Sequence, residues 1–433
     1  MTVIGLDDTD SRERGMCTTY LATRIADRVR DARGDVERLL LVRLNPAVKH
    51  KTRGNAALAI HTDLDPVPAF ELAREELETT AETGDPDTNP GLVVAPHEPE
   101  DIPDEISEFA RLAVQNLLTR EEAERRIESA GYRSAGWKNA RGKIGALAAV
   151  GSWNAFSEWT YEHISYRESE RWGTPRDVDF DSVFEAADDH YPAIWDTVDR
   201  GTGEAVCMPH TPCPILYGIR GDDPDAVRRV AAKIEGEPVV RTALFVTNQG
   251  TDAHLRDANL GEAEDDRAYR VGGIVASEPE TRRGGHVFFT LSEGSDTKSK
   301  SESESSDTLP CAAFEPTKRF RDHVRNLRPG DEITVCGEVS RGTLKLEKFA
   351  IRSLNATELV TPNCPKCSQS MKSAGAGQGY RCRECKTRAD GKREREIDRE
   401  LESGWYEVPP EARRHIAKPL VRGGFDGRTH PER

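Results

Sequence analysis

Three carboxylates lie within four residues near the start of the chain, at Asp7, Asp8 and Asp10. Carboxylates packed this closely repel one another unless a divalent cation or hydrogen-bond donors offset their charge. Mg²⁺ bound by Asp7, Asp8 and the phosphates of a nucleotide is the economical explanation. An Asp-rich turn that caps the following helix explains the same residues without a ligand, and this alternative stays open.

Groups that bind phosphate follow the Asp cluster along the chain. Segment 15–20 places Thr18 and a second hydroxyl at an expected helix N-terminus, where the helix dipole favours phosphate. A basic loop over 49–55 and a glycine-rich basic turn over 136–145 have the composition of phosphate-binding loops. The residues predicted to bind ATP phosphates in these loops are Lys51, Arg53, Asn55 and Lys143. Each segment alone is weak evidence, but together they predict a nucleotide site.

Two Cys-x-x-Cys pairs near the C-terminus form the most specific motif of the sequence. The pairs have 14 residues between their inner cysteines. This spacing suits two knuckles that close a tetrahedral Zn²⁺ site, and four thiolates make such a site structural. The predicted ligands are Cys364, Cys367, Cys382 and Cys385. Coincidental cysteines stay the less favoured alternative.

Two further segments, 209–220 and 247–254, open and close a predicted β-α-β unit over 214–248. Because they stand at the two ends of one unit, both can line one crevice. The first contains His210 and the second contains Asp252. A turn-rich boundary without any ligand explains them equally well.

The elements that must position these residues alternate between strands and helices in the N-terminal part. Strands are predicted at 3–6, 39–44, 56–61 and 91–95, and helices at 17–30, 70–77, 106–118 and 120–129. Short strands separated by glycine turns, typical of a small barrel, are predicted at 271–275, 286–291, 332–339 and 343–351. The predicted fold class is therefore multidomain α+β.

Three other stretches carry weaker signals. Residues 155–200 are polar and aromatic, and no element is predicted there. Residues 293–308 are rich in Ser, Glu, Asp and Lys and predict a disordered insertion in the barrel. The charged tail, 391–433, is expected to be only partly folded on its own.

Composition points to an intracellular protein of several domains. The 433 residues exceed what one hydrophobic core supports. There is no apolar run of about 20 residues and no signal peptide, so no membrane partner and a cytoplasmic location are expected. The other five cysteines are scattered, which suits a reducing compartment. A net charge of −15 with mostly Arg cations is what adaptation to high salt would produce, and local Arg clusters can still bind RNA.

The segments named above also occur together in one known family. Over nearly the whole chain, and in the same order, they resemble archaeal tRNA agmatinylcytidine synthetase. The resemblance implies four modules: a kinase-like α/β catalytic domain, a ferredoxin-like domain, an OB-fold β-barrel and a zinc ribbon. The matching segments are Asp7–Ser11, Gly15–Tyr20, Arg43–Pro46, Lys51–Asn55, Pro209–Arg220, Thr247–Leu255 and the four cysteines.

On this resemblance the chain divides into five parts. The catalytic domain takes 1–195, although 61–118 could pack with the next domain. The ferredoxin-like domain takes 196–262 and the OB fold takes 268–355. The zinc ribbon takes 360–390, and the charged tail follows it.

The resemblance also implies a reaction. ATP is consumed to AMP and phosphates, and agmatine replaces the 2-oxo group of the wobble cytidine in the isoleucine tRNA with a CAU anticodon, so that AUA codons are read. Thr18 matches a threonine that the family phosphorylates. Asp7, Asp8 and Asp10 would then hold Mg²⁺ and orient ATP. Agmatine is a cation, and Asp252 and His210 are the candidates to bind it.

Two other functions compatible with the same residues stay open. One is another ATP-dependent RNA ligase or RNA kinase, which needs no amine. The other is a tRNA-binding protein without catalysis, which leaves the Asp cluster unexplained. The oligomeric state does not follow from the sequence.

Overall fold

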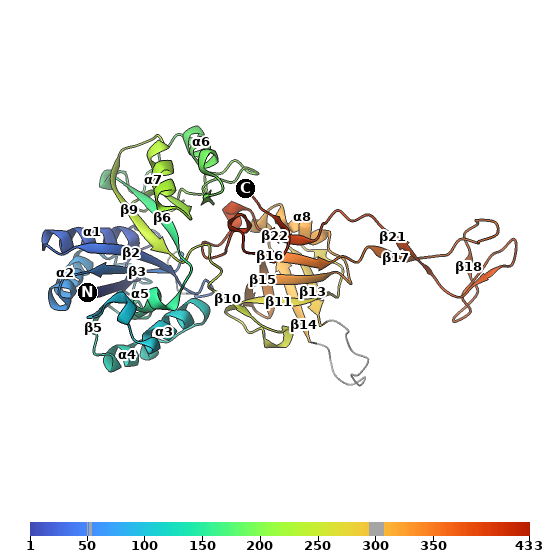
Figure 1. Ribbon diagram of the computed structural model, residues 1–433, viewed down its shortest axis with the longest axis horizontal. Helices are drawn as coiled ribbons and strands as arrows, with labels where there is room; N and C mark the ends of the chain where they lie inside the picture. Colours follow the sequence, from blue (N-terminus) through green and yellow to red (C-terminus); the bar gives the residue numbers. More distant parts are fainter. Residues whose placement is uncertain (50, 52–53, 294–306) are drawn as a thin grey trace.

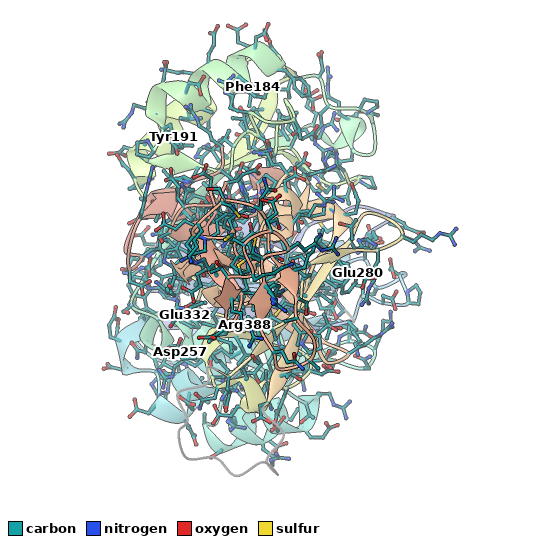
Figure 2. All side chains as sticks on the ribbon, turned by 90° about the vertical axis from the view of Figure 1, so that its right-hand side faces the viewer. Phe184, Tyr191, Asp257, Glu280, Glu332 and Arg388 are labelled. Carbon is teal, nitrogen blue, oxygen red and sulfur yellow. The ribbon has the colours of Figure 1, made fainter. Side chains whose placement is uncertain are left out.

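The computed structural model describes residues 1–49, 51, 54–293 and 307–433 (Figure 1). Three masses follow one another along the long axis: a large α/β body, a β-barrel and a small ribbon. Viewed from the ribbon end, Arg388 of the ribbon lies in front of the barrel, and Phe184 and Tyr191 of the α/β body lie above it (Figure 2). None of the helices in the described ranges combines the length and the apolar character needed to cross a lipid bilayer.

A nine-stranded sheet forms the centre of the α/β body, in the order β5-β4-β1-β3-β2-β9-β6-β8-β7. The four strands predicted before residue 100 are present, although β2 begins three residues earlier than predicted. A short parallel pairing, Leu40 with Val246 and Leu41 with Thr247, joins the two halves of the sheet. The strands are β1 (Thr2–Asp7), β2 (Val36–Arg43), β3 (Ala56–Thr62), β4 (Gly91–Ala95), β5 (Arg133–Gly136), β6 (Thr160–Arg167), β7 (Ile194–Trp195), β8 (Ile215–Gly221) and β9 (Val239–Thr247).

Helices cover both faces of this sheet. Alternate residues of β1 point to opposite faces, so Val3 packs with α3 and α5 whereas Ile4 packs with α1 and α2. Helix α5 lies so close to β1 that a Cβ on Gly5 would be 2.1 Å from the carbonyl oxygen of Ala146. The helices are α1 (Thr18–Asp31), α2 (Pro66–Thr80), α3 (Asp104–Gln115), α4 (Arg120–Ser129), α5 (Lys143–Ala155), α6 (Phe180–His190) and α7 (Pro224–Lys233).

Two strand pairings bear on the predicted domain boundary at residue 195 of this body. Strand β4 pairs with β1, so segment 61–118 packs within the N-terminal half rather than with the next unit. Strand β6 was not predicted, yet it lies between β9 and β8, antiparallel to both. Because β6 precedes residue 195 and its partners follow it, one sheet runs across the predicted boundary. The boundaries and the kinase-like and ferredoxin-like labels stay predictions.

The predicted barrel is confirmed and closes with five strands. Each strand pairs with the next in the cycle β11-β13-β14-β16-β15-β11. A bulge in β15 falls between Cys336 and Gly337, where a Cβ on Gly337 would meet the Lys345 carbonyl oxygen at 1.9 Å. Strand β14 was not predicted. The elements are β11 (Arg267–Val275), β13 (Val287–Ser292), β14 (Thr308–Ala313), α8 (Phe320–Arg325), β15 (Glu332–Ser340) and β16 (Thr343–Ser353).

The predicted insertion between β13 and β14 lies almost wholly outside the described residues. Within the described range, Ser292 and Thr308 form the last pair of the β13–β14 ladder. The insertion therefore enters and leaves the barrel at the end of one hairpin.

The charged tail, which was expected to be only partly folded on its own, is ordered here by packing on the barrel. Strand β22 (Gly404–Glu407) pairs with β16 of the barrel, and Trp405 is 2 % exposed. The chain then runs between the barrel and the α/β body (Figure 1). We call residues 413–422 the C-terminal strap. Its cations pair with carboxylates of both bodies, and these partners come from distant parts of the sequence.

Candidate active site

A cavity of about 430 Å³ lies where the two halves of the sheet, the barrel and the strap meet. Its polar wall contains the Asp cluster at the end of β1 and the N-terminus of α1. Leu41, Leu44 and Ile164 contribute to an apolar wall. Asp266 comes from the edge of the barrel and His415 from the strap. The other polar lining residues are Asp7, Asp8, Asp10, Cys17, Thr18, Thr19, Arg43, Lys49, Lys51, Asn55, Asn116, Arg141, Glu162, Thr211 and Cys213.

The Asp cluster is crowded, with Asp10 buried and Asp7 and Asp8 only partly exposed. Burial and the adjacent charge of Asp8 hold the pKa of Asp7 well above its usual range. Burial raises the pKa of Asp8 to about 6, although Arg141 opposes the shift through a contact of 2.9 Å between its Nη2 and the Asp8 Oδ2. A Cβ on Gly145 would lie 2.0 Å from the Asp7 Oδ2, so any larger residue there would displace this carboxylate. Carboxylates whose ionised form is disfavoured by burial fit a cation, because a bound cation restores that form.

Thr18 faces this cluster from the first residue of α1. The Thr9 hydroxyl donates a hydrogen bond of 3.1 Å to the Thr18 Oγ1. The N-cap residue, Cys17, forms no side-chain cap, so the first amide groups of the helix are not satisfied in that way. The Thr18 hydroxyl therefore lies beside carboxylates and a helix N-terminus, an arrangement suited to a phosphoryl acceptor.

A buried hydrogen-bonded network forms another part of the wall, and it was not predicted. The Arg43 Nε and Nη2 donate to the Gln249 Oε1 at 3.1 and 2.9 Å. The Gln249 Nε2 donates to the Glu162 Oε2 at 2.5 Å, and the Arg220 Nε lies 3.4 Å from the Glu162 Oε1. Glu162 belongs to β6, whose residues show no periodic signal. Gln249 belongs to the second of the two dense segments.

The predicted phosphate-binding residues do not all lie in the cavity. Lys51 and Asn55 line it, and their side chains donate to the carbonyl oxygens of Pro46 and Asn45. The Lys143 Nζ contacts the Glu124 Oε1 at 3.2 Å and does not line the cavity. Arg53 lies outside the described residues. Arg141, two residues before Lys143, reaches the Asp cluster instead.

The geometry does not support the two candidates for agmatine binding. The Asp252 carboxylate is buried and accepts hydrogen bonds from the Lys348 Nζ at 2.9 and 2.7 Å, so a cation of the chain already offsets its charge. The His210 side chain is 85 % exposed, and its Nε2 lies 3.6 Å from the Glu204 Oε1. Neither residue is among the described residues that line the cavity.

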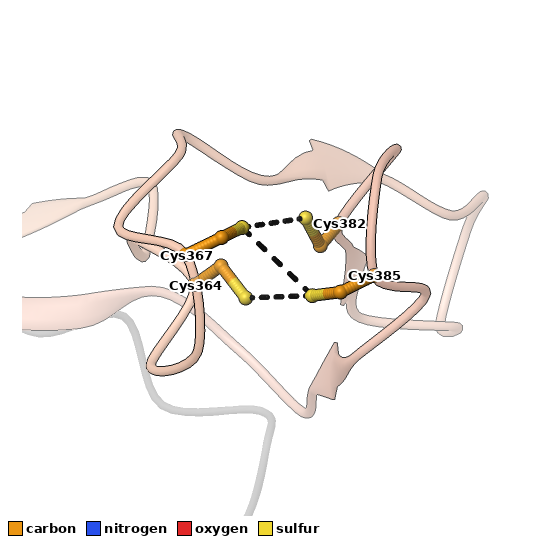
Figure 3. A group of neighbouring side chains, drawn as sticks. All are labelled: Cys364, Cys367, Cys382 and Cys385. Carbon is orange, nitrogen blue, oxygen red and sulfur yellow. Dashed lines mark hydrogen bonds between the residues drawn. The ribbon is translucent and has the colours of Figure 1, made fainter.

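The four cysteines of the predicted zinc site come together in the ribbon (Figure 3). All four sulfur atoms lie within 4.8 Å of one another. A tetrahedral site with bonds of about 2.3 Å requires sulfur atoms about 3.8 Å apart, so the cluster fits Zn²⁺. Cys364 and Cys382 are buried beside Met371 in a very small core. Within the described ranges this is the group of His, Cys, Asp and Glu side chains that meets the geometry of a metal site.

The fold and the site define a multidomain α+β protein with an acidic cavity at a strand end, a five-stranded barrel and a four-cysteine ribbon. Three family descriptions match its segments: the TiaS TCKD domain at residues 3–65, the TiaS FLD domain at 140–254 and the TiaS C-terminal zinc ribbon domain at 361–401. The chain is 54 % identical to the isoleucine-tRNA 2-agmatinylcytidine synthetase TiaS of Haloquadratum walsbyi and 44 % identical to that of Methanosarcina acetivorans, covering all of each chain.

Solved structures agree with these relatives. The crystal structure of a complex of TiaS with isoleucine tRNA and ATP has a TM-score of 0.88 and 41 % identity over 100 % of this chain and 99 % of that one. A complex of TiaS with the tRNA, AMPCPP and agmatine has a TM-score of 0.85 and 39 % identity over the same shares. The chain therefore belongs to the family of isoleucine-tRNA 2-agmatinylcytidine synthetases (TiaS), which confirms the resemblance noted in the sequence.

Proposed function

We propose that the chain is an ATP-dependent ligase that conjugates agmatine to carbon 2 of the wobble cytidine in the isoleucine tRNA with a CAU anticodon. The product, 2-agmatinylcytidine, allows AUA codons to be read. The observation that carries this proposal is that relatives matching end to end are named for this reaction. The chain also has a cavity in which carboxylates, hydroxyls and cations meet, as this reaction requires. A tRNA-binding protein without catalysis would have no need of such a cavity.

The chemistry requires activation of the cytidine. The 2-oxo oxygen on the pyrimidine ring is a poor leaving group, so it must be phosphorylated before an amine can displace it. Asp7, Asp8 and Asp10 would bind and orient the triphosphate together with Mg²⁺, whose charge offsets that of the carboxylates when it is bound. Lys51 and Arg141 lie on the cavity wall, where they can stabilise developing phosphate charge.

Thr18 is proposed as the acceptor of the γ-phosphoryl group of ATP, and the α-phosphate as the group that activates the cytidine oxygen. Two features support the first assignment: the Thr18 hydroxyl lines the cavity, and it accepts a hydrogen bond from Thr9, which orients it. AMP and phosphates are then the products of ATP.

The two organic substrates need different parts of the cavity. The cytidine must leave its stack to enter, and the apolar wall suits the face of a base. The cationic amine needs carboxylates, and the lining carboxylates outside the Asp cluster are Glu162 and Asp266. The barrel and the zinc ribbon would hold the body of the tRNA, mainly through its shape.

The test is incorporation of radiolabelled agmatine into this tRNA by the purified chain in high-KCl buffer with ATP and Mg²⁺. Label must enter with the wild type and fall to background with Asp8→Asn. Asp101→Asn, which changes an exposed carboxylate outside the cavity lining, is the matched control and must keep full incorporation. Binding of the tRNA without any label would refute the ligase proposal.

A further inference from the structure

Asp252 joins three parts of the molecule through one buried carboxylate. It follows the turn after β9, and its backbone is left-handed with φ of 62°. Its oxygens accept from the Nζ of Lys348, on barrel strand β16, and from the backbone N–H of Lys418, in the strap, at 2.7 Å. The Lys348 side chain is only 2 % exposed, and its Nζ also donates to the Lys418 carbonyl oxygen at 2.6 Å. The α/β body, the barrel and the strap therefore meet at this ion pair.

The same turn is bonded to the strap through its backbone. The Gly250 N–H donates to the His415 carbonyl oxygen at 2.8 Å. The N–H groups of Thr251 and Asp252 donate to the Ile416 carbonyl oxygen at 3.2 and 3.0 Å. The strap thus runs along the turn as a short irregular ladder and places His415 in the cavity wall.

The other end of the turn holds a cavity residue. The Asn248 Oδ1 accepts from the Arg43 backbone N–H at 2.7 Å, and Gln249 accepts from the Arg43 guanidinium. Asp252 is therefore only three residues from the group that holds Arg43 in the cavity. The turn therefore links Lys348 of the barrel, through Asp252, to the groups that hold Arg43 in the cavity wall.

Further ion pairs tie the strap to the α/β body. The Lys418 Nζ lies 3.0 Å from the Glu158 Oε1, and the Arg422 Nη2 lies 2.7 Å from the Asp222 Oδ1. Arg413 pairs with Asp196 of the α/β body and with Glu407 of β22. The pairs with Glu158, Asp222 and Asp196 fix the strap to the α/β body. On the barrel side the strap is held by Lys348, by Glu407 and by Glu347, which pairs with Arg414.

We propose that Asp252 is a positioning residue, which through Lys348 and the strap fixes the barrel against the cavity so that RNA bound by the barrel presents its cytidine in register with the reacting groups. The proposal rests on the proposed function. A reaction between two bound substrates depends steeply on alignment, and misplacement by about 1 Å can cost about a hundredfold in rate. Positioning residues of this kind affect turnover more than they affect binding.

Two single variants test the ion pair. Lys348→Met keeps the length of the side chain and removes its charge. Asp252→Asn also removes a charge and tolerates the left-handed backbone. The control is Asp257→Asn, the same chemical change at an exposed carboxylate whose partner, Arg270, lies 3.6 Å away. For each protein, binding of ATP alone, binding of the tRNA and the kcat of agmatine conjugation are measured, with hydrogen exchange at residues 248–252.

We expect the variants to lower kcat while both dissociation constants stay close to those of the wild type. Both variants keep the Kd for ATP and for the tRNA within about threefold of the wild type, and kcat falls on the order of 10- to 100-fold. Amide protection is lost at Gly250 and Thr251 and kept in β1 and β16. The control matches the wild type throughout.

Two results would overturn the proposal. One is a kcat within about twofold of the wild type in both variants after protection at Gly250 is lost. The other is a parallel fall of ATP binding, tRNA binding and kcat, which marks a merely structural role. If a single variant does not fold, the double variant Asp252→Asn/Lys348→Met, which leaves no unpaired buried charge at this pair, is judged by the same comparison of kcat with the dissociation constants. Absence of conjugation by the wild type would instead refute the proposed function, and the exchange data would still report the coupling of barrel and turn.

Discussion

At the scale of single residues, the position of the Asp7 carboxylate in the cavity depends on the absence of a side chain at Gly145. Gly145 occupies the first turns of α5, directly against the Asp7 carboxylate. Alanine is preferred to glycine inside a helix by about 1 kcal/mol, so Gly145→Ala ought to stabilise the helix. Its Cβ would nevertheless meet the Asp7 Oδ2 at 2.0 Å and displace it. We expect conjugation to fall about a hundredfold without a loss of thermal stability.

Steady-state kinetics together with thermal melting check this prediction. Gly272→Ala is the matched control, because a Cβ on Gly272 meets no described atom within 4 Å. It must keep wild-type kinetics. Full activity of Gly145→Ala would show that the position of Asp7 is not essential.

His61 gives a prediction about pH. It is 0 % exposed, neither ring nitrogen has a partner within the described ranges, and burial, with Arg38, lowers its pKa to about 3. The unfolded chain, with an ordinary His pKa near about 6.5, therefore binds a proton that the folded chain does not. The resulting stability is complete above about pH 6.5 and is lost as the pH falls toward 3, by about 2 kcal/mol between pH 6.5 and 5.

His61→Phe removes this titration and keeps the ring that lies edge-on to Trp153. The free energy of unfolding of the variant must exceed that of the wild type by a margin that grows from pH 7 to pH 5. Denaturant unfolding at several pH values measures the margin. A margin that stays constant with pH would mean that His61 has the same pKa in the folded and in the unfolded chain.

Single residues also show where prediction from sequence ends. Asp7, Asp8 and Thr18 could be placed in one site because a strand, a turn and a helix bring them together over a few residues. Asp252 lies in a segment whose residues suit a cation site. Its carboxylate is instead neutralised by Lys348, which is 96 residues away in the sequence. Glu162 and His415 come from segments that carry no local signal for the site, and only the assembled fold brings them to the cavity.

At the scale of elements, the zinc ribbon has almost no core apart from its cysteines. Its small core contains the buried residues Cys364, Met371 and Cys382. Removal of zinc by a chelator should therefore unfold residues 361–401 and leave the barrel folded, because the barrel has its own core. Hydrogen exchange measures the loss of protection in the ribbon and its retention in the barrel in one experiment. Before the chelator is added, metal analysis must give one Zn²⁺ per chain.

Cys382→Ser should reproduce the effect of the chelator. A substitution of the free cysteine Cys311, which is buried in the barrel away from the cluster, serves as the control for zinc content. Protection of the ribbon that survives complete loss of zinc would refute the structural role of the metal.

Elements with strong periodic patterns were predictable, and those stabilised by distant partners were not. Helix α1 follows from its apolar spacing, and Leu21, Ile25 and Val29 are all buried. Strand β6 is covered on both edges by β8 and β9, yet its sequence, Thr-Tyr-Glu-His-Ile-Ser-Tyr-Arg, mixes polar and aromatic residues because Glu162 and Arg167 have buried ion partners. The strap is ordered by ion pairs of the same kind. Because its partners are distant in the sequence, its charged composition alone predicted a partly folded tail.

At the scale of the whole molecule, the net charge of −15 opposes the compact state. Salt screens repulsion between exposed carboxylates, whereas the buried pairs of the strap are screened much less. Raising KCl from about 0.1 to 2 M should increase the melting temperature by on the order of a few °C. Differential scanning fluorimetry checks this, and a melting temperature that falls with KCl would show that exposed ion pairs matter more than net repulsion.

For the proposed function, the whole molecule also has to bring a tRNA to a cavity that lies between two bodies. The ribbon, the barrel and the α/β body follow one another along the long axis (Figure 1), and the cavity lies where the barrel meets the α/β body. The strap closes the junction between the barrel and the α/β body. Catalysis is thus expected only from the assembled chain.

The most direct measurement is mass spectrometry of nucleosides digested from the CAU-anticodon isoleucine tRNA after incubation with the chain, ATP, Mg²⁺ and agmatine. We predict that one cytidine, at the wobble position, is converted to 2-agmatinylcytidine, and that conversion requires ATP and is abolished in Asp8→Asn. An unmodified wobble cytidine after incubation with folded, tRNA-binding protein would contradict the proposed function.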